Sequence, residues 1–285
     1  MGTRGVDTRG VAWWLRAYLA FAAVQGFGIG LTGLLVPAEM QIPLRISPLN
    51  ARFVAALYIA GGLGVLWAAF ARRPAQTRLF VLGFGLATGL ILILTVVHWS
   101  EFMADPLPHR PVWLFDYVAD PLLALLIVPA AGLWPPRPWQ PWRGQRLSPL
   151  LLVEAALFAA LGLALLLAPD AVAAAWPWSL PAVLGQLYAC FFLTFTVGAT
   201  LAAGETEPAA RGAFVLSSLA LVTLALVASL LHLDRFKAEP VSVVWFAALG
   251  VGVAAFGWAL LPVRARRWRR APVAAGPGGG RLSRV

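Results

Sequence analysis

Four polar residues near one end of two neighbouring apolar segments have side-chain types and spacings suited to binding a metal ion or transferring protons. Asp116 and Asp120 are four residues apart and therefore share one face of a helix. His98 and Glu101, three residues apart, share a face in the same way. Two carboxylates beside a His and a Glu could bind a divalent metal ion or move protons. His232 has a similar place later in the chain and is the fifth candidate for ligand or proton handling.

The depth of the two aspartates favours a buried site. At 1.5 Å per residue, Asp116 and Asp120 lie about 7 and 13 Å past the start of their segment. A carboxylate exposed to lipid is costly, so both should face a protein interior or a wet cavity, and we expect His98 to line that cavity with them. His98 and His232 also have a simpler interpretation as hydrated helix caps at headgroup depth. The alternative roles for these two histidines are proton handling and binding of a metal ion or haem.

Two further polar residues lie inside apolar segments. Glu154 should extend its carboxylate toward the membrane surface and toward Arg143 or Arg146. Gln25 is more typical of a hydrogen bond between helices than of a ligand site.

The composition shows which elements must position these residues. Of 285 residues, 60% are hydrophobic and 12% are charged, and the mean hydropathy is +0.80. A soluble domain would carry about a quarter charged residues. The composition excludes a soluble enzyme and a disordered chain, and unbroken apolar runs exclude an outer-membrane barrel, whose strands would alternate.

Eight apolar runs of helical length divide the chain, and proline-rich turns separate them. A run of about 20 residues crosses the hydrocarbon layer as a helix, the only open-chain structure that pairs its own backbone groups in lipid. The sequence therefore predicts an all-α integral membrane protein with both termini on one side. The runs are Ala17 to Val36, Phe53 to Ala71, Leu79 to Trp99, Val112 to Leu133, Leu150 to Ala168, Ala182 to Ala203, Gly212 to Leu231 and Val241 to Leu261.

The loops on one side of the predicted membrane carry most of the positive charge. They hold 17 of the 22 basic residues, and the loops on the other side hold five. By the positive-inside rule, both termini should be cytoplasmic in the cell (inner) membrane.

Rare residue types recur at a nearly constant separation along the chain. The offsets lie between 130 and 134 residues, and this predicts that four spans were duplicated into eight. Because each unit has an even number of spans, the two should be parallel four-helix repeats related by an axis along the membrane normal. The recurring residues are Pro37 with Pro169, Tyr58 with Tyr188, His98 with His232, Phe102 with Phe236 and Trp113 with Trp245.

The predicted organisation follows from this duplication. Residues 1–134 form the first four-helix repeat, 135–148 a cytoplasmic linker and 149–262 the second repeat. Residues 263–285 form a basic, disordered tail. Ala248 and Gly252 stand where the first repeat has its two aspartates, so any carboxylate site belongs to the first repeat.

Each repeat has a first span ending in Pro, a second with small residues such as Gly61 and Gly62, and a third ending in His-x-x-x-Phe, as from His98 to Phe102. This order resembles the DoxX-like four-helix membrane proteins. The resemblance covers about 85 residues of each half and implies a link to quinone-side redox complexes or an accessory role. The second half lacks the Gly pair, and the resemblance implies no catalytic residue.

Familiar catalytic and nucleotide-binding motifs do not apply. The run Gly28–Gly33 matches the dinucleotide fingerprint by letter, but it lies inside an apolar span and follows no strand. Gly26 and Gly30, like Gly85 and Gly89, have instead the four-residue spacing that lets helices approach closely. The sequence has no Walker loop, serine elbow, HExxH or CxxC motif. We therefore assign no catalytic residue and expect no cofactor.

A basic cluster follows the last span directly. At about 1 kcal/mol per basic residue, it should bind anionic membrane lipids, and its position beside the membrane argues against nucleic acid. Its members are Arg264, Arg266, Arg267, Arg269 and Arg270.

The sequence leaves three functions open. The favoured one is binding or transport of a small apolar or amphipathic molecule between the two repeats, near His98, Asp116 and Asp120. The first alternative is a non-catalytic accessory subunit of a quinone-linked or respiratory membrane complex. The second is a metal-dependent membrane enzyme that uses these residues together with Glu101.

Overall fold

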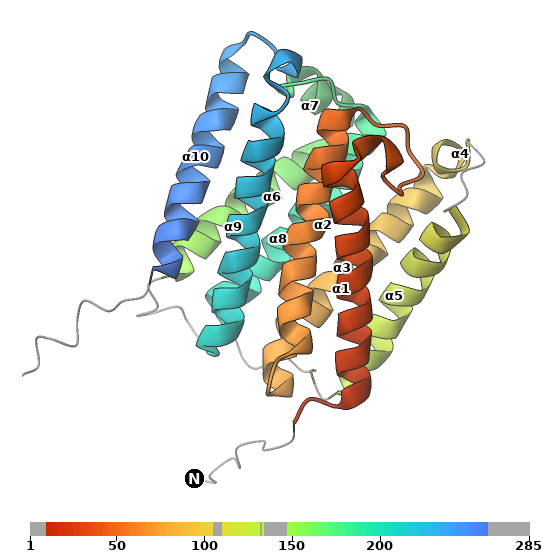
Figure 1. The fold of residues 1–285 in the computed structure, drawn as a ribbon, viewed down its shortest axis with the longest axis vertical. Coiled ribbons are helices and arrows are strands. Elements are labelled where there is room, and N and C mark those ends of the chain that lie inside the picture. The colour runs from red at the N-terminus through yellow and green to blue at the C-terminus, as the bar shows by residue number, and fades with distance from the viewer. Residues whose placement is uncertain (1–9, 105–109, 132, 134–146, 262–285) are drawn as a thin grey trace, which may run out of the picture.

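The computed structural model describes residues 10–104, 110–131, 133 and 147–261. In these ranges every regular element is a helix, and eight helices are long and apolar enough to cross a membrane (Figure 1). The prediction of an all-α integral membrane protein with eight spans is confirmed. The spanning helices are α1 (Trp13–Leu35), α2 (Pro48–Ala69), α3 (Pro74–Val97), α5 (Arg110–Ala130), α6 (Ser148–Leu167), α8 (Ala182–Ala203), α9 (Pro208–Leu230) and α10 (Pro240–Leu260).

The observed helices begin up to five residues before the predicted runs and end within three residues of them. Proline explains most of the difference at the starts, because it fits the first turn, where its missing N–H is not needed. The helices α2, α3, α9 and α10 each start on a proline. In these four helices, hydrophobicity alone marked the apolar part and missed the residues at the start.

Four short elements at the ends of the spans, within the described ranges, were not predicted. They are η1 (Pro37–Glu39), α4 (Trp99–Phe102), α7 (Pro169–Ala175) and η2 (Leu233–Arg235). They follow the first, third, fifth and seventh spans, which are α1, α3, α6 and α9. They therefore gather at the end of the bundle opposite the start of α1 (Figure 1).

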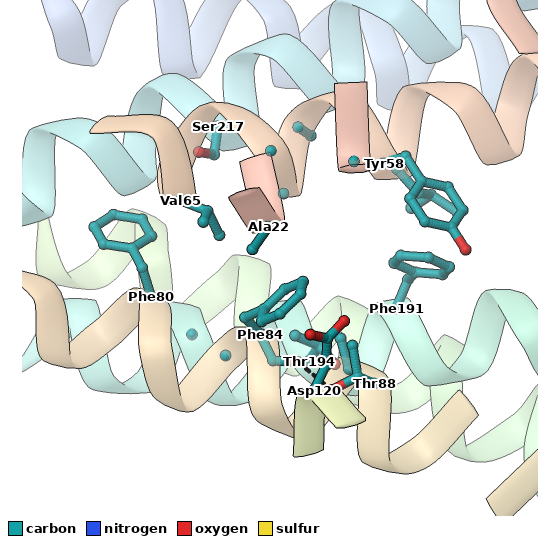
Figure 2. Close-up of a pocket in the computed structure, with 18 of the residues that line it drawn as sticks. Ala22, Tyr58, Val65, Phe80, Phe84, Thr88, Asp120, Phe191, Thr194 and Ser217 are labelled. Carbon is teal, nitrogen blue, oxygen red and sulfur yellow. Dashed lines mark hydrogen bonds between the residues drawn. The ribbon is translucent and has the colours of Figure 1, made fainter. Parts of the chain in front are cut away.

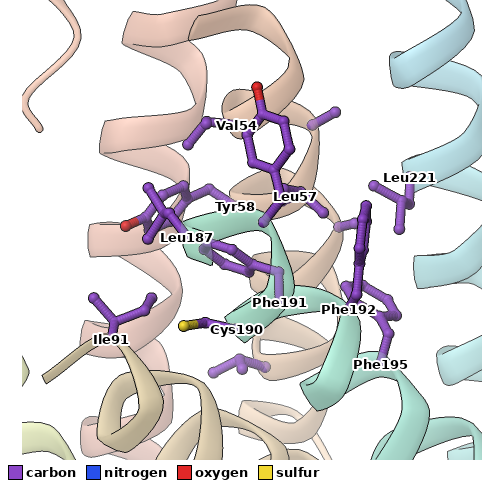
Figure 3. Packing of buried hydrophobic residues seen from close by; sticks show 14 of the residues in the cluster. Val54, Leu57, Tyr58, Ile91, Leu187, Cys190, Phe191, Phe192, Phe195 and Leu221 are labelled. Carbon is purple, nitrogen blue, oxygen red and sulfur yellow. The ribbon is translucent and has the colours of Figure 1, made fainter. Parts of the chain in front are cut away.

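The centre of the bundle is formed by α2 and α8, which are the most buried spans. α1 packs along α2, and α6 packs along α8. α3 packs against both α5 and α8, while α9 packs against both α10 and α2. Large buried side chains such as Leu57, Leu187 and Phe192 fill the space where α2 and α8 face each other (Figure 3).

Glycines allow the outer helices to approach this centre closely. A Cβ on Gly30 of α1 would lie 2.6 Å from the Ile59 side chain of α2, and one on Gly162 of α6 would lie 3.0 Å from the Leu193 side chain of α8. On α3, a Cβ on Gly85 would lie 2.5 Å from Ala124 of α5. The predicted use of Gly30 and Gly85 for close helix contact is confirmed.

Two other kinds of contact occur twice in the bundle. Gly64 of α2 accommodates the Phe80 ring, since an added Cβ would lie 2.5 Å from it, and Gly198 of α8 accommodates Phe214 at the same 2.5 Å. In each half, a tryptophan indole also donates a hydrogen bond to a hydroxyl group on the preceding span. The Trp113 indole donates to Thr95 Oγ1 at 3.4 Å, and the Trp245 indole donates to Ser229 Oγ at 3.0 Å.

Polar contacts join the first four spans to the last four. Asn50, buried on α2, accepts from the Trp178 indole at 2.6 Å and from the Tyr188 hydroxyl at 2.9 Å. At the opposite end, Arg78 of α3 pairs at 3.3 Å with Glu205, which follows α8. These contacts join the two halves near both ends of the bundle.

Candidate functional site

A cavity of about 120 Å³ lies between the two halves of the chain. One water needs roughly 10–15 Å³ of such space, so the cavity has room for several waters or a small organic group. Its walls come from α1, α2, α3 and α5 of the first half and from α8 and α9 of the second. Figure 2 shows Asp120 beside Phe84, with Tyr58 and Phe191 further along the same space.

Asp116 and Asp120 both line this cavity, as their shared helix face predicted. Asp120 is only 4% exposed, and Asp116 is partly exposed. Among the described residues, no side chain or backbone donor forms a hydrogen bond with the Asp120 carboxylate, and no Arg or Lys pairs with either aspartate. Asp120 lies near the middle of α5, roughly 15 Å from its first residue. A buried carboxylate without a partner therefore faces an open space at mid-membrane depth.

Gln25 and two tyrosines surround the aspartates. The Gln25 side chain on α1 lies beside the Asp116 carboxylate, and its buried Oε1 has no hydrogen-bond partner among the described residues. The hydroxyls of Tyr58 on α2 and Tyr117 on α5 bond to each other. All three residues line the cavity and add polar atoms to it.

The other hydroxyls of the cavity bond back to their own helices. Thr88 Oγ1 donates to the Phe84 carbonyl at 2.9 Å, and Thr194 Oγ1 donates to the Cys190 carbonyl at 2.8 Å. Ser217 bonds its helix in the same way. Because these donors are already used, they do not satisfy the carboxylates.

Aromatic rings form the apolar walls. Phe84 packs edge-on against Tyr18, with ring centroids 6.1 Å apart, and Phe191 does the same against Tyr58 at 5.1 Å. Phe80, Phe195 and Phe214 complete the apolar side. The site therefore has one acidic end and one long aromatic surface, a typical lining for a small-molecule pocket.

The cavity is only partly enclosed. Gly61 of α2 lines it and is exposed, and a Cβ there would meet no atom within 4 Å. α1 and α5 make few contacts beside it, one being the bond from the Tyr18 hydroxyl to the Asp120 backbone carbonyl at 3.4 Å. At mid-membrane depth, an opening between helices faces hydrocarbon rather than water.

The expectation that His98 lines the same cavity is wrong. The lining includes neither His98 nor Glu101. His98 ends α3, and its Nδ1 lies 3.3 Å from the carboxylate of Glu101, which is about half exposed. Helix α3 continues for two turns past the cavity, and this places His98 at the helix end while Asp120 lies at mid-depth.

The metal site considered from the sequence does not form. Among the described residues, no three His, Cys, Asp or Glu side chains come together in a way that could hold a metal ion. His98 and Glu101 form one pair, and Asp116 and Asp120 line a separate space. The four residues therefore do not fit the ligand set of a metal-dependent enzyme.

His232 belongs to a different site, where the two halves meet. Its Nε2 contacts the Arg52 guanidinium of α2, which also donates to the Leu34 carbonyl at 3.1 Å. A second cavity, of about 190 Å³, lies between His232, the start of α2 at Ser47 and Trp178. Burial first, and then the charge of Arg52, lower the pKa of His232 below its ordinary value.

The expectation for Glu154 is also wrong. Its side chain does not reach the membrane surface but is buried, with 6% exposed, and both carboxylate oxygens lack a hydrogen-bond partner among the described residues. Helix α6 begins at Ser148, so Glu154 lies nearly two turns inside it. Arg143, Arg146 and the predicted lipid-binding arginines of the tail lie outside the described residues.

Sequence reasoning missed Tyr58 and Tyr117 as parts of the site and read Gln25 only as a contact between helices. One signal was available, because the chain has only four tyrosines and Tyr117 is next to Asp116. Tyr58 lies on another helix, and nothing in its local sequence connects it to Asp120.

No known protein family model, curated protein or solved structure matches this chain.

Proposed function

We propose that this membrane protein binds a small amphipathic molecule in the cavity that contains Asp116 and Asp120. The observation that carries the proposal is the Asp120 carboxylate, buried without a partner in a partly open space with aromatic walls. A carboxylate at the centre of a bilayer costs about 3 kcal/mol even on the lenient insertion scale. A ligand that contacts it can recover part of that cost, and the aromatic walls can hold the ligand's apolar part.

The molecule enters from the lipid. The cavity lies at mid-depth and is only partly enclosed, and its lining includes Gly61 and residues of the weakly packed pair α1 and α5. The apolar part of an amphipathic ligand concentrates it in the membrane, from which it can reach the cavity without a continuous aqueous path. Binding is the minimal function, and movement between the two leaflets would use the same site.

We also propose that the chain arose by tandem duplication of a DoxX-like four-helix unit. Three contacts support this proposal, because each recurs with both partners displaced by 132 to 134 residues: Gly30 with Ile59, Gly64 with Phe80, and Trp113 with Thr95. The two units are parallel, and both termini are cytoplasmic in the cell membrane, as the distribution of basic residues favours.

Native mass spectrometry of the purified protein tests the binding function. We expect a co-purifying small molecule on the wild-type protein and its loss from Gly61→Phe, whose ring would occupy the cavity. Gly28→Phe is the matched control, since Gly28 is also exposed with no atom within 4 Å of an added Cβ but does not line the cavity. Equal occupancy of wild-type protein and both variants would contradict the proposal.

A further inference from the structure

We infer that the ligand is a lipophilic ammonium ion with N–H donors, held at Asp116 and Asp120 with its apolar part along the aromatic wall. This inference rests on the proposed binding function and names the chemical class of the ligand.

The acidic end of the cavity has hydrogen-bond acceptors without matching donors. The Asp120 carboxylate accepts no hydrogen bond from the described residues, and Gln25 Oε1 is buried without a partner there. Asp116, one helical turn away, has the Gln25 side chain beside it. These three side chains come from two helices, α1 and α5, and line one space. Together they present acceptors that an N–H-bearing group would satisfy.

The described residues supply no cation to this end. No Arg, Lys or His of the described ranges lines the cavity. Arg16, at the start of α1, donates instead to the Ala69 and Ala71 carbonyls, at 3.0 and 2.8 Å. Buried carboxylates are normally paired or hydrogen-bonded. A positively charged ligand would supply the missing partner, whereas an anion would be repelled by both aspartates.

The rest of the lining fits the remainder of such a ligand. Phe84 lies beside Asp120 (Figure 2), and an aromatic ring at that place can attract a cation bound to the carboxylate. Phe80, Phe195 and Phe214 add apolar surface to the same cavity. A quaternary ammonium would gain the charge interaction but leave the acceptors unsatisfied, so a primary or secondary amine is the better fit.

The test compares eight-carbon probes on the full-length protein in phosphatidylcholine nanodiscs. The probes are n-octylamine, n-octyltrimethylammonium, octan-1-ol and octanoate, with affinities measured by isothermal titration calorimetry against empty nanodiscs. We expect n-octylamine to bind at least tenfold tighter than octan-1-ol, n-octyltrimethylammonium to be intermediate, and octanoate to be the weakest. Octan-1-ol binding as tightly as n-octylamine would overturn the inference.

Variants connect this preference to the aspartates. Asp116→Asn and Asp120→Asn should each weaken n-octylamine binding at least tenfold and leave octan-1-ol binding unchanged. Asp170→Asn, at an exposed aspartate of α7 that does not line the cavity, is the matched control and should change neither. Unchanged n-octylamine binding in both aspartate variants would overturn the inference. If either variant fails to fold, the probe comparison on the wild-type protein decides alone.

Failure of the inference can be distinguished from failure of the proposed function. Gly61→Phe should abolish binding of n-octylamine and octan-1-ol alike. If octan-1-ol binds and is lost in Gly61→Phe but n-octylamine has no advantage, the binding function stands and the ammonium class is wrong. If neither probe binds the wild-type protein, both proposals fail.

A final arm identifies the source of the ammonium group. Adding phosphatidylethanolamine to the nanodiscs should weaken n-octylamine binding if the natural ligand is that lipid headgroup. It should leave binding unchanged if the ligand is a free amine. Once the probe comparison has shown the preference for n-octylamine, the first result assigns the ammonium group to the lipid headgroup and the second assigns it to a free amine.

Discussion

Arg73, just before α3, forms an ion pair at 3.3 Å with Glu207, just before α9. The two residues are 134 positions apart, the same separation that relates the recurring residues of the two halves. In a structure with two-fold symmetry, a residue can contact its own counterpart only near the symmetry axis. The proposed axis therefore passes close to this ion pair.

The first prediction concerns this symmetry. In an experimental structure, superposing residues 13–134 on 149–262 should bring His98 onto His232 and Trp113 onto Trp245. The rotation axis should run near the membrane normal and pass beside Arg73 and Glu207. An axis in the membrane plane would contradict the parallel duplication, because it would require an odd number of spans in each half.

The second prediction concerns the glycines that accommodate aromatic rings. Gly64→Ala and Gly198→Ala should each lower the free energy of unfolding by about 1–3 kcal/mol, because the new methyl would overlap the Phe80 or Phe214 ring. Gly28→Ala, where an added Cβ meets no atom within 4 Å, should be neutral or slightly stabilising because alanine favours helix. Thermal unfolding in detergent measures all three. Equal effects at Gly64 and Gly28 would contradict the tight packing.

The third prediction concerns pH and His232. Because its pKa is lowered in the folded protein, the unfolded chain takes up the proton first as the pH falls. The stabilisation from neutral His232 should be fully present above the ordinary histidine pKa of about 6.5 and decline as the pH falls through that value. The charged groups near it are Arg52, Asp234 and Arg235. His232→Gln should show a smaller loss of thermal stability between pH 7.5 and 5.5, and an identical loss would contradict this role.

The fourth prediction concerns orientation in the membrane. Reporter fusions after Pro74 and Glu207 should report the cytoplasm, and fusions after Asp170 and Lys237 the opposite side. The reason is the division of basic residues, 17 on one side and five on the other. Asp170 and Glu207 on the same side would contradict the order of spans between them.

The sequence predicts the eight spans well because each is an unbroken apolar run, and in lipid such a run has no alternative to helix. It also places Asp116 and Asp120 together, because two residues four positions apart on one helix share a face. It could not place His98, since the position of one helix along another depends on packing, such as Gly85 against Ala124. The prediction for Glu154 was wrong for a related reason, because neighbouring helices determine whether a side chain can reach the membrane surface.

A density map of the purified protein in lipid nanodiscs tests the binding site most directly. We predict non-protein density in the cavity, in contact with the Asp120 carboxylate and continuing along Phe84. The same map of Gly61→Phe should lack this density while the helices keep their positions. A wild-type cavity closed by side chains, or one that holds only water, would contradict the account.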